Sequence, residues 1–120
     1  MDKLDIIFER QALLDSAVQD NTGRMATMEA DEKIQKKVMA MQVELAELLD
    51  EVNYKWWKNK KPVDIKKVHE ELADILHFFI SACITAGLSA QSLFEVYNSK
   101  NKENHNRQQG KSDKQGYKPD

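Results

Sequence analysis

The sequence predicts an all-α fold, an antiparallel four-helix bundle, and three observations lead to it. Apolar residues recur every three or four positions along most of the 120 residues, which is the spacing of one helix face. Only two prolines and four glycines interrupt the chain. No segment alternates apolar and polar residues as a half-buried strand does. The helical segments are joined by short links, which favour antiparallel neighbours.

The first two helices are expected over residues 3–20 and 31–54. Turn-forming residues at 20–23 end the first helix, and Gly23 is the residue best suited to its last position. The second helix is on the order of 35 Å long at about 1.5 Å per residue. Its apolar stripe consists of Ile34, Val38, Met41, Leu45, Leu48 and Val52.

The third and fourth helices follow a turn at 58–62. Asp64 is a suitable N-cap for a helix that reaches about Ala86, and Gly87 ends it. Ser89 caps a fourth helix, which continues to about Asn104. We therefore expect one domain over residues 1–108 and a mobile basic tail over 109–120 that closes over bound phosphates.

Composition narrows the class of protein. Apolar residues make up 41% of the chain and charged residues 32%, which is typical of a folded helical domain. The net charge of −2 argues against a general nucleic-acid binder. A single cysteine, Cys83, allows no internal disulfide, and the start of the chain lacks the long apolar run of a signal peptide. The longest apolar-rich stretch, 75–87, is too short for a membrane span. These features favour a cytoplasmic protein.

Two carboxylate pairs are the strongest indication of function. Glu44 and Glu47 lie on the second predicted helix, and Glu71 and Asp74 lie on the third. A spacing of three residues places both members of a pair on one helix face. If the two helices pack antiparallel, the four carboxylates meet and need a strong compensating charge. Mg²⁺, with Mn²⁺ as a substitute, is the cation that best suits such oxygen ligands, and it most often acts on phosphates.

A solvated acidic face is the plainer interpretation of the same pairs. However, each pair interrupts an apolar stripe, and partly buried carboxylates require partners. This position favours a metal site. In hydrolysis of a phosphate ester, one glutamate must also orient or deprotonate the attacking water, and we expect this to be Glu44 or Glu47, with a preference for Glu44.

Three further segments, together with the carboxylate pairs, resemble the dimeric, all-α dUTPase branch of the MazG-like nucleoside triphosphate pyrophosphohydrolases. The resemblance covers residues 4 to 117. The three segments are Leu4-x-x-Ile7-Phe8-x-x-Gln11-x-x-Leu14-Asp15; Lys55-Trp56-Trp57-Lys58 with His77-Phe78-Phe79; and Tyr97-x-x-Lys100-Asn101-x-x-Asn104-x-x-Arg107-Gln108 with Gly116-Tyr117.

The resemblance implies a homodimeric enzyme that converts dUTP, and also dUDP, to dUMP with Mg²⁺. It implies that Glu44, Glu47, Glu71 and Asp74 hold the metal. The residues implied to line the base pocket are Gln11, Asp15, Trp57, His77 and Phe79. The residues implied to bind phosphates are Lys100, Asn101, Asn104, Arg107 and Tyr117.

Two alternatives stay open at this point. Asp15 stands where some members of that branch have Asn, and a carboxylate accepts hydrogen bonds without donating any. The chain is also short for the branch. Both points leave room for a related enzyme that acts on dCTP or on a modified nucleotide. A non-enzymatic helical interaction protein is the alternative from a different class, in which the carboxylates form a solvated face.

Overall fold

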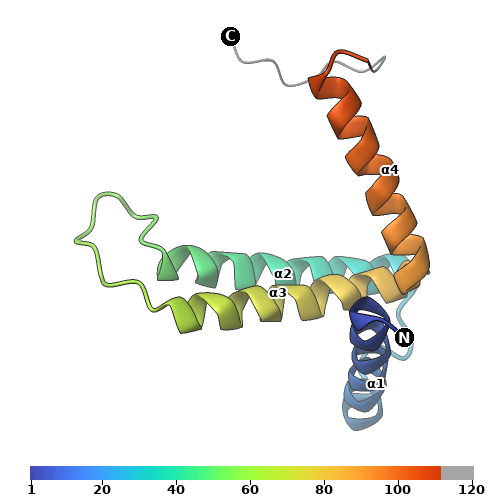
Figure 1. Ribbon diagram of the computed structural model, residues 1–120. Helices are drawn as coiled ribbons and strands as arrows, with labels where there is room; N and C mark the ends of the chain where they lie inside the picture. The colour runs from blue at the N-terminus through green and yellow to red at the C-terminus, as the bar shows by residue number, and fades with distance from the viewer. Residues whose placement is uncertain (112–120) are drawn as a thin grey trace. The chain divides into compact units, whose positions relative to one another are not determined.

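The computed structural model describes residues 1–111, which contain four α-helices and no strand (Figure 1). The helices are α1 (Lys3–Thr22), α2 (Ala30–Glu51), α3 (Ile65–Thr85) and α4 (Ala90–Gln108). The all-α class is therefore confirmed. The chain divides into two compact units: α1, α2 and α3 belong to Met1–Gly87, and α4 belongs to the unit that starts at Leu88. Residues 112–120, which include most of the expected tail and Tyr117, lie outside the described residues.

Local signals in the sequence set the helix ends. Asp64 and Ser89 are the N-caps of α3 and α4, as predicted, and their side chains accept hydrogen bonds from backbone N–H groups of the first turn. Asp2 caps α1 in a reciprocal arrangement with Asp5, which the sequence analysis did not anticipate. Gly23 ends α1 with φ of 61°, a left-handed conformation that glycine adopts without steric cost.

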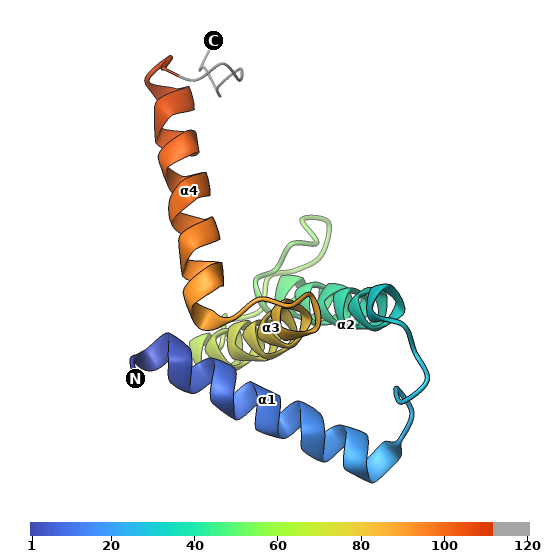
Figure 2. The same ribbon diagram turned by 90° about the vertical axis from the view of Figure 1, so that its right-hand side faces the viewer.

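α2 and α3 form an antiparallel hairpin, in which the two helices lie side by side along their length (Figures 1 and 2). The side chain of Asn53 holds the link between them. Its Nδ2 donates to the Lys61 carbonyl oxygen, and its Oδ1 accepts from the Lys61 N–H, both at 2.9 Å. Asn53 itself has φ of 58°, which asparagine tolerates better than most residues. The link therefore sets the register in which α2 faces α3.

α1 crosses α3 near the end of the hairpin that is remote from this link, and it does not run along the hairpin as a third member of an antiparallel bundle (Figures 1 and 2). The buried residues of the first unit gather on these two helices: Phe8, Gln11, Ile80, Ser81 and Cys83. Cys83 is a free, buried thiol and packs as a small core residue.

The core of the first unit is small, and much apolar surface remains exposed. α2 has no buried residue at all. Val43, Leu45 and Leu49 of its central turns are each about half exposed, at 58%, 47% and 46%. Among residues 1–111, no single helix is long and apolar enough to cross a membrane. The length and composition criteria are met only by α3 and α4 taken together as one bent pair.

Candidate functional site

Three carboxylates from two helices meet on the α2–α3 hairpin. Glu44 and Glu47 of α2 and Glu71 of α3 each place one carboxylate oxygen within 4.8 Å of the others. The antiparallel packing of α2 and α3 brings them together, because residues far apart in the sequence then face each other across the hairpin. Asp74 is exposed and lies one turn after Glu71, outside this group. We call Glu44, Glu47 and Glu71 the carboxylate group.

Two oxygens of the carboxylate group have lost water without gaining a partner. Glu44 Oε2 and Glu71 Oε2 are buried, and neither has a hydrogen-bond partner in the described chain. A buried acceptor without a donor costs free energy, and a carboxylate costs more than a neutral group. A cation or a proton between these oxygens removes that cost. The donor set consists of oxygen atoms alone, which fits a hard divalent cation such as Mg²⁺.

The pKa of Glu44 reflects the closeness of the three carboxyl groups. Burial raises the pKa of its carboxyl group from 4.5 to about 7, and the neighbouring carboxyl groups of Glu71 and Glu47 act in the same direction. Near neutral pH, Glu44 in the metal-free protein therefore holds a proton for much of the time.

Glu44→Gln should make the metal-free protein more stable at alkaline pH than the parent protein. Because the pKa of Glu44 is higher in the folded state than its ordinary value of 4.5, its contribution to stability is complete below pH 4.5 and is lost as the pH rises through about 7. Glutamine does not titrate, so the variant lacks this loss. Melting temperatures with a chelator, at about pH 5.5 and about pH 8, measure the difference.

Glu70→Gln is the matched control for this measurement, because Glu70 is exposed and adjacent to Glu71 in sequence. It should lose stability with rising pH as the parent protein does. A Glu44→Gln variant that melts at a lower temperature than the parent at alkaline pH would show that the carboxylate is not strained by its neighbours.

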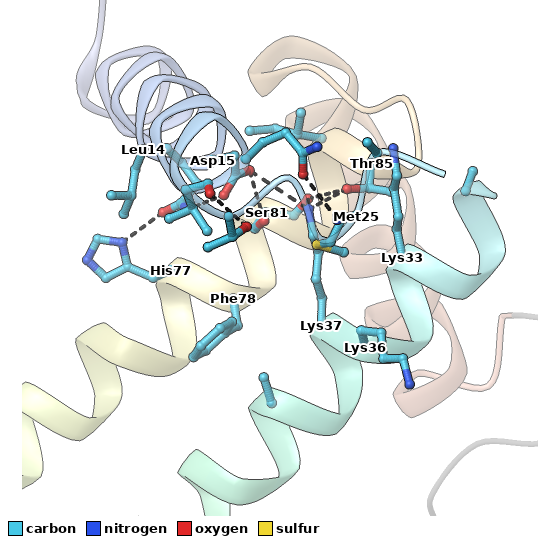
Figure 3. Close-up of a pocket in the computed structure, with 18 residues that line it drawn as sticks. Leu14, Asp15, Met25, Lys33, Lys36, Lys37, His77, Phe78, Ser81 and Thr85 are labelled. Carbon is cyan, nitrogen blue, oxygen red and sulfur yellow. Dashed lines mark hydrogen bonds and ion pairs between the residues drawn. The ribbon is translucent and has the colours of Figure 1, made fainter. Parts of the chain in front are cut away.

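A second polar cluster connects α1 to α3 (Figure 3). Gln11 is 6% exposed, and its Nε2 donates to Asp15 Oδ1 at 2.9 Å. Its Oε1 lies 2.7 Å from Nδ1 of His77. Ser81 Oγ donates to the other Asp15 oxygen at 2.8 Å. Gln11, Asp15 and His77, which were expected to line one pocket, therefore lie together. Gln11 and His77 are 66 residues apart in the sequence.

Lys37 of α2 completes this cluster, and the sequence analysis missed it. Its Nζ donates to Thr85 Oγ1 at 2.6 Å and to the Ser81 carbonyl oxygen at 3.3 Å, and it lies 3.9 Å from Asp15 Oδ2. Burial lowers the pKa of Lys37, and the attraction of the Asp15 carboxylate works against that effect. One signal was available: Lys37 precedes Glu44 by seven residues and so shares its helix face.

The cluster borders a cavity of about 730 Å³ between α1, α2, α3 and the loop that follows α1. Its walls are largely apolar, with Leu14, Met25, Phe78 and Ile84 among them, and a few polar side chains converge on it. This combination is common in pockets for small organic molecules. Along α3, Glu71 and His77 are six residues apart, which is roughly 9 Å along the helix axis and about 120° around it.

Two residues expected in the base pocket do not join this cluster. Trp57 belongs to the link between α2 and α3, at the opposite end of the hairpin from the α1 crossing (Figure 1). It is 59% exposed and packs edge-on against Tyr54 and Trp56. Phe79 follows His77 by two residues, which is about 200° around the helix, and it is 41% exposed. The neighbouring Phe78 lines the cavity instead.

The residues expected to bind phosphates lie on α4, in the second unit. Lys100, Asn104 and Arg107 are spaced by four and three residues, so they share one face of that helix. Asn101 adjoins this face and is exposed. Tyr117 lies outside the described residues.

Comparison with known proteins identifies a family. A family model described as dUTPase matches residues 3–92. No curated protein and no solved structure gives a significant match. The matched range contains both carboxylate pairs and the whole cluster around Asp15. It ends near the start of α4, before the residues expected to bind phosphates.

Proposed function

Because this chain belongs to the all-α dUTPase family, we propose that it is a Mg²⁺-dependent dUTP pyrophosphohydrolase. The reaction converts dUTP and water to dUMP and pyrophosphate, and dUDP is a second expected substrate. The observation that carries the proposal is the carboxylate group, in which two buried oxygens have no partner. Buried carboxylate oxygens without partners raise the free energy of the metal-free protein, and a bound cation removes that cost.

Glu44, Glu47 and Glu71 would hold the metal, and Asp74, one turn after Glu71 on α3, would join them when the metal binds. When bound, Mg²⁺ supplies charge neutralisation for the triphosphate. The chain must also accept a proton from the attacking water. Glu44 is our choice for this role, because its Oε2 is buried within the carboxylate group and has no hydrogen-bond partner in the described chain.

Gln11, Asp15 and His77 would orient the base, since their polar atoms are fixed by hydrogen bonds at the edge of a largely apolar cavity. Their distance from Glu71 along α3 leaves room for the sugar between base and phosphates. On α4, Lys100 and Arg107 would contact the phosphates, and an Arg side chain can bind two oxygens at once. Asn101, Asn104 and Tyr117 are neutral donors for the same role.

We also propose that the enzyme is a homodimer. Apolar side chains outside the cavity, such as Leu13 of α1 and Val43 and Leu49 of α2, are 67%, 58% and 46% exposed. A surface of this kind is typical of a protein–protein interface. A second copy of the chain would cover it.

Pyrophosphate release from a panel of nucleotides tests the proposed reaction. With Mg²⁺, the protein should cleave dUTP well and dCTP, dTTP, dATP and dGTP poorly, and a chelator should remove the activity. Glu70→Gln should behave as the parent protein does. Metal-dependent cleavage that is equal for dUTP and dCTP would contradict uracil selection. No cleavage of any nucleotide would contradict the enzyme assignment and favour a binding protein.

A further inference from the structure

The cavity extends beyond the cluster around Asp15 to a second end with a different chemical character. This end is formed by the last turn of α1, the loop at residues 23–29 and the first turns of α2. Figure 3 shows Lys33 and Lys36 on the opposite side of the view from His77. We call this part of the cavity the lysine end, and the residues that define it are Met25, Ala30, Lys33 and Lys36.

The lysine end carries positive charge that the protein does not compensate. Lys33, Lys36 and Lys37 all line the cavity, and their spacing of three or four residues places them on one face of α2. Asp15 is the one carboxylate among the described residues that line the cavity, and it faces Lys37 at 3.9 Å. The side chains of Lys33 and Lys36 make no hydrogen bond or ion pair within residues 1–111.

The lysines also repel one another. Burial lowers the pKa of Lys37, the Asp15 carboxylate opposes this effect, and the charge of Lys33 adds to the lowering. Lys33 is half-buried, so water and salt screen its charge less than that of a fully exposed lysine. An anion at this end would attract Lys33 and Lys36, and it would offset the repulsion between Lys33 and Lys37.

The walls beside these lysines are apolar and enclose more space than a simple salt ion fills. The cavity volume of about 730 Å³ lies within the roughly 300–1,000 Å³ of pockets that hold drug-sized organic molecules. Met25 has a flexible side chain that adapts its shape to an apolar neighbour. Aliphatic walls of this kind suit an alkyl chain, and the residues that provide them are Val18, Met25, Ala26, Ala30 and Ile84.

The lysine end is separate from the carboxylate group. Lys33 precedes Glu44 by eleven residues, which is roughly 16 Å along α2. A nucleotide with its phosphates at the carboxylate group and its base beside His77 would not reach Lys33 or Lys36. The plainer explanation of these two lysines is that their stems cover apolar surface while their charged ends stay in water. That explanation predicts no preference for a ligand of either charge.

We propose that the lysine end binds an organic anion with an alkyl chain, of the class of a medium-chain carboxylate. The anionic group lies between the ammonium groups of Lys33 and Lys36, and the chain lies against Met25 and Ile84. The two lysines select the charge of the ligand, and the aliphatic walls bind its chain. This site uses neither a metal nor a nucleotide, so it does not depend on the proposed enzymatic function.

Calorimetric titration of the full chain with octanoate, in the presence of a chelator and without nucleotide, tests the proposal. Octanol offers the same chain without the charge, and acetate offers the charge without the chain. Octanoate should bind at least about tenfold more tightly than octanol, and acetate should give no measurable binding. Lys33→Met and Lys36→Met keep an apolar stem. Each should weaken octanoate binding by about tenfold and leave octanol binding unchanged.

Lys67→Met is the matched control, because Lys67 is an exposed lysine of α3 that does not line the cavity. It should bind octanoate as the parent protein does. Methyl NMR with labelled methionine locates the ligand. Octanoate should shift the signal of Met25, which is assigned by its loss in Met25→Leu. The signal of Met39, which is 57% exposed on α2 outside the cavity, should stay in place.

Two kinds of result would overturn the proposal. Equal affinity for octanoate and octanol, or unchanged octanoate affinity in both lysine variants, would show that the lysines do not select an anion and would favour the plainer explanation. No binding of octanoate, or a shift at Met39 without one at Met25, would exclude the lysine end as the site. Failure of the protein to cleave any nucleotide would contradict the proposed function and leave this site standing, because the titration contains neither metal nor nucleotide.

Discussion

Glu71→Gln is expected to lower kcat for dUTP by about a thousandfold, because it removes a charged ligand that the reaction needs for several kcal/mol of charge stabilisation. Glu71 is half-buried and is the only member of the carboxylate group that α3 contributes. Its Oε2 is buried and has no hydrogen-bond partner in the described chain. Steady-state kinetics with dUTP and titration with Mn²⁺ as a paramagnetic probe measure both effects.

The control is again Glu70→Gln, which removes the same charge from the adjacent exposed position and should keep both activity and metal binding. The melting temperature of Glu71→Gln without metal should equal or exceed that of the parent protein, since like charges are removed. Substantial activity in Glu71→Gln would show that the metal is held elsewhere. Asp74→Asn should also lose activity if Asp74 moves in to complete the site, and an unaffected variant would restrict the site to three carboxylates.

The helices and the carboxylate group were predictable because the signals that specify them are local or depend on one short link. Asp64, Gly87 and Ser89 act within one turn of their own positions. Glu44 and Glu71 could be brought together by reasoning, since a link of 13 residues between α2 and α3 leaves antiparallel packing as the simplest arrangement.

The course of α1 could not be predicted in the same way, and the missed residues follow from it. An apolar stripe shows that a helix packs, but it does not fix the angle at which it packs. The sequence therefore gave no reason to place Lys37, Ser81 and Thr85 beside Asp15, because they become neighbours only where α1 crosses the hairpin. Trp57 and Phe79 do not line the cavity. Their expected place rested on a resemblance in sequence, and such a resemblance does not determine which end or face of the α2–α3 hairpin a side chain occupies.

Ile80→Ala is expected to lower the free energy of unfolding by about 2–5 kcal/mol, a large part of the roughly 5–15 kcal/mol that a domain of this size has in total. Ile80 is 1% exposed and is the one large side chain that is fully buried in the described residues. It lies on α3 between His77 and Ser81, where α1 crosses. Urea denaturation measures the loss, and Ile80→Val should cost only about 0.5–1.5 kcal/mol.

The effect of Ile80→Ala on function should fall on one half of the site. At low temperature, where the variant is still folded, looser packing beneath α1 should raise KM for dUTP, because Gln11 and Asp15 are held on α3 by that crossing. The carboxylate group belongs to the α2–α3 hairpin and does not depend on α1, so the affinity for Mn²⁺ should change little. A parallel loss of metal affinity and substrate affinity would contradict this division, and it would show that the hairpin has no stability of its own without α1.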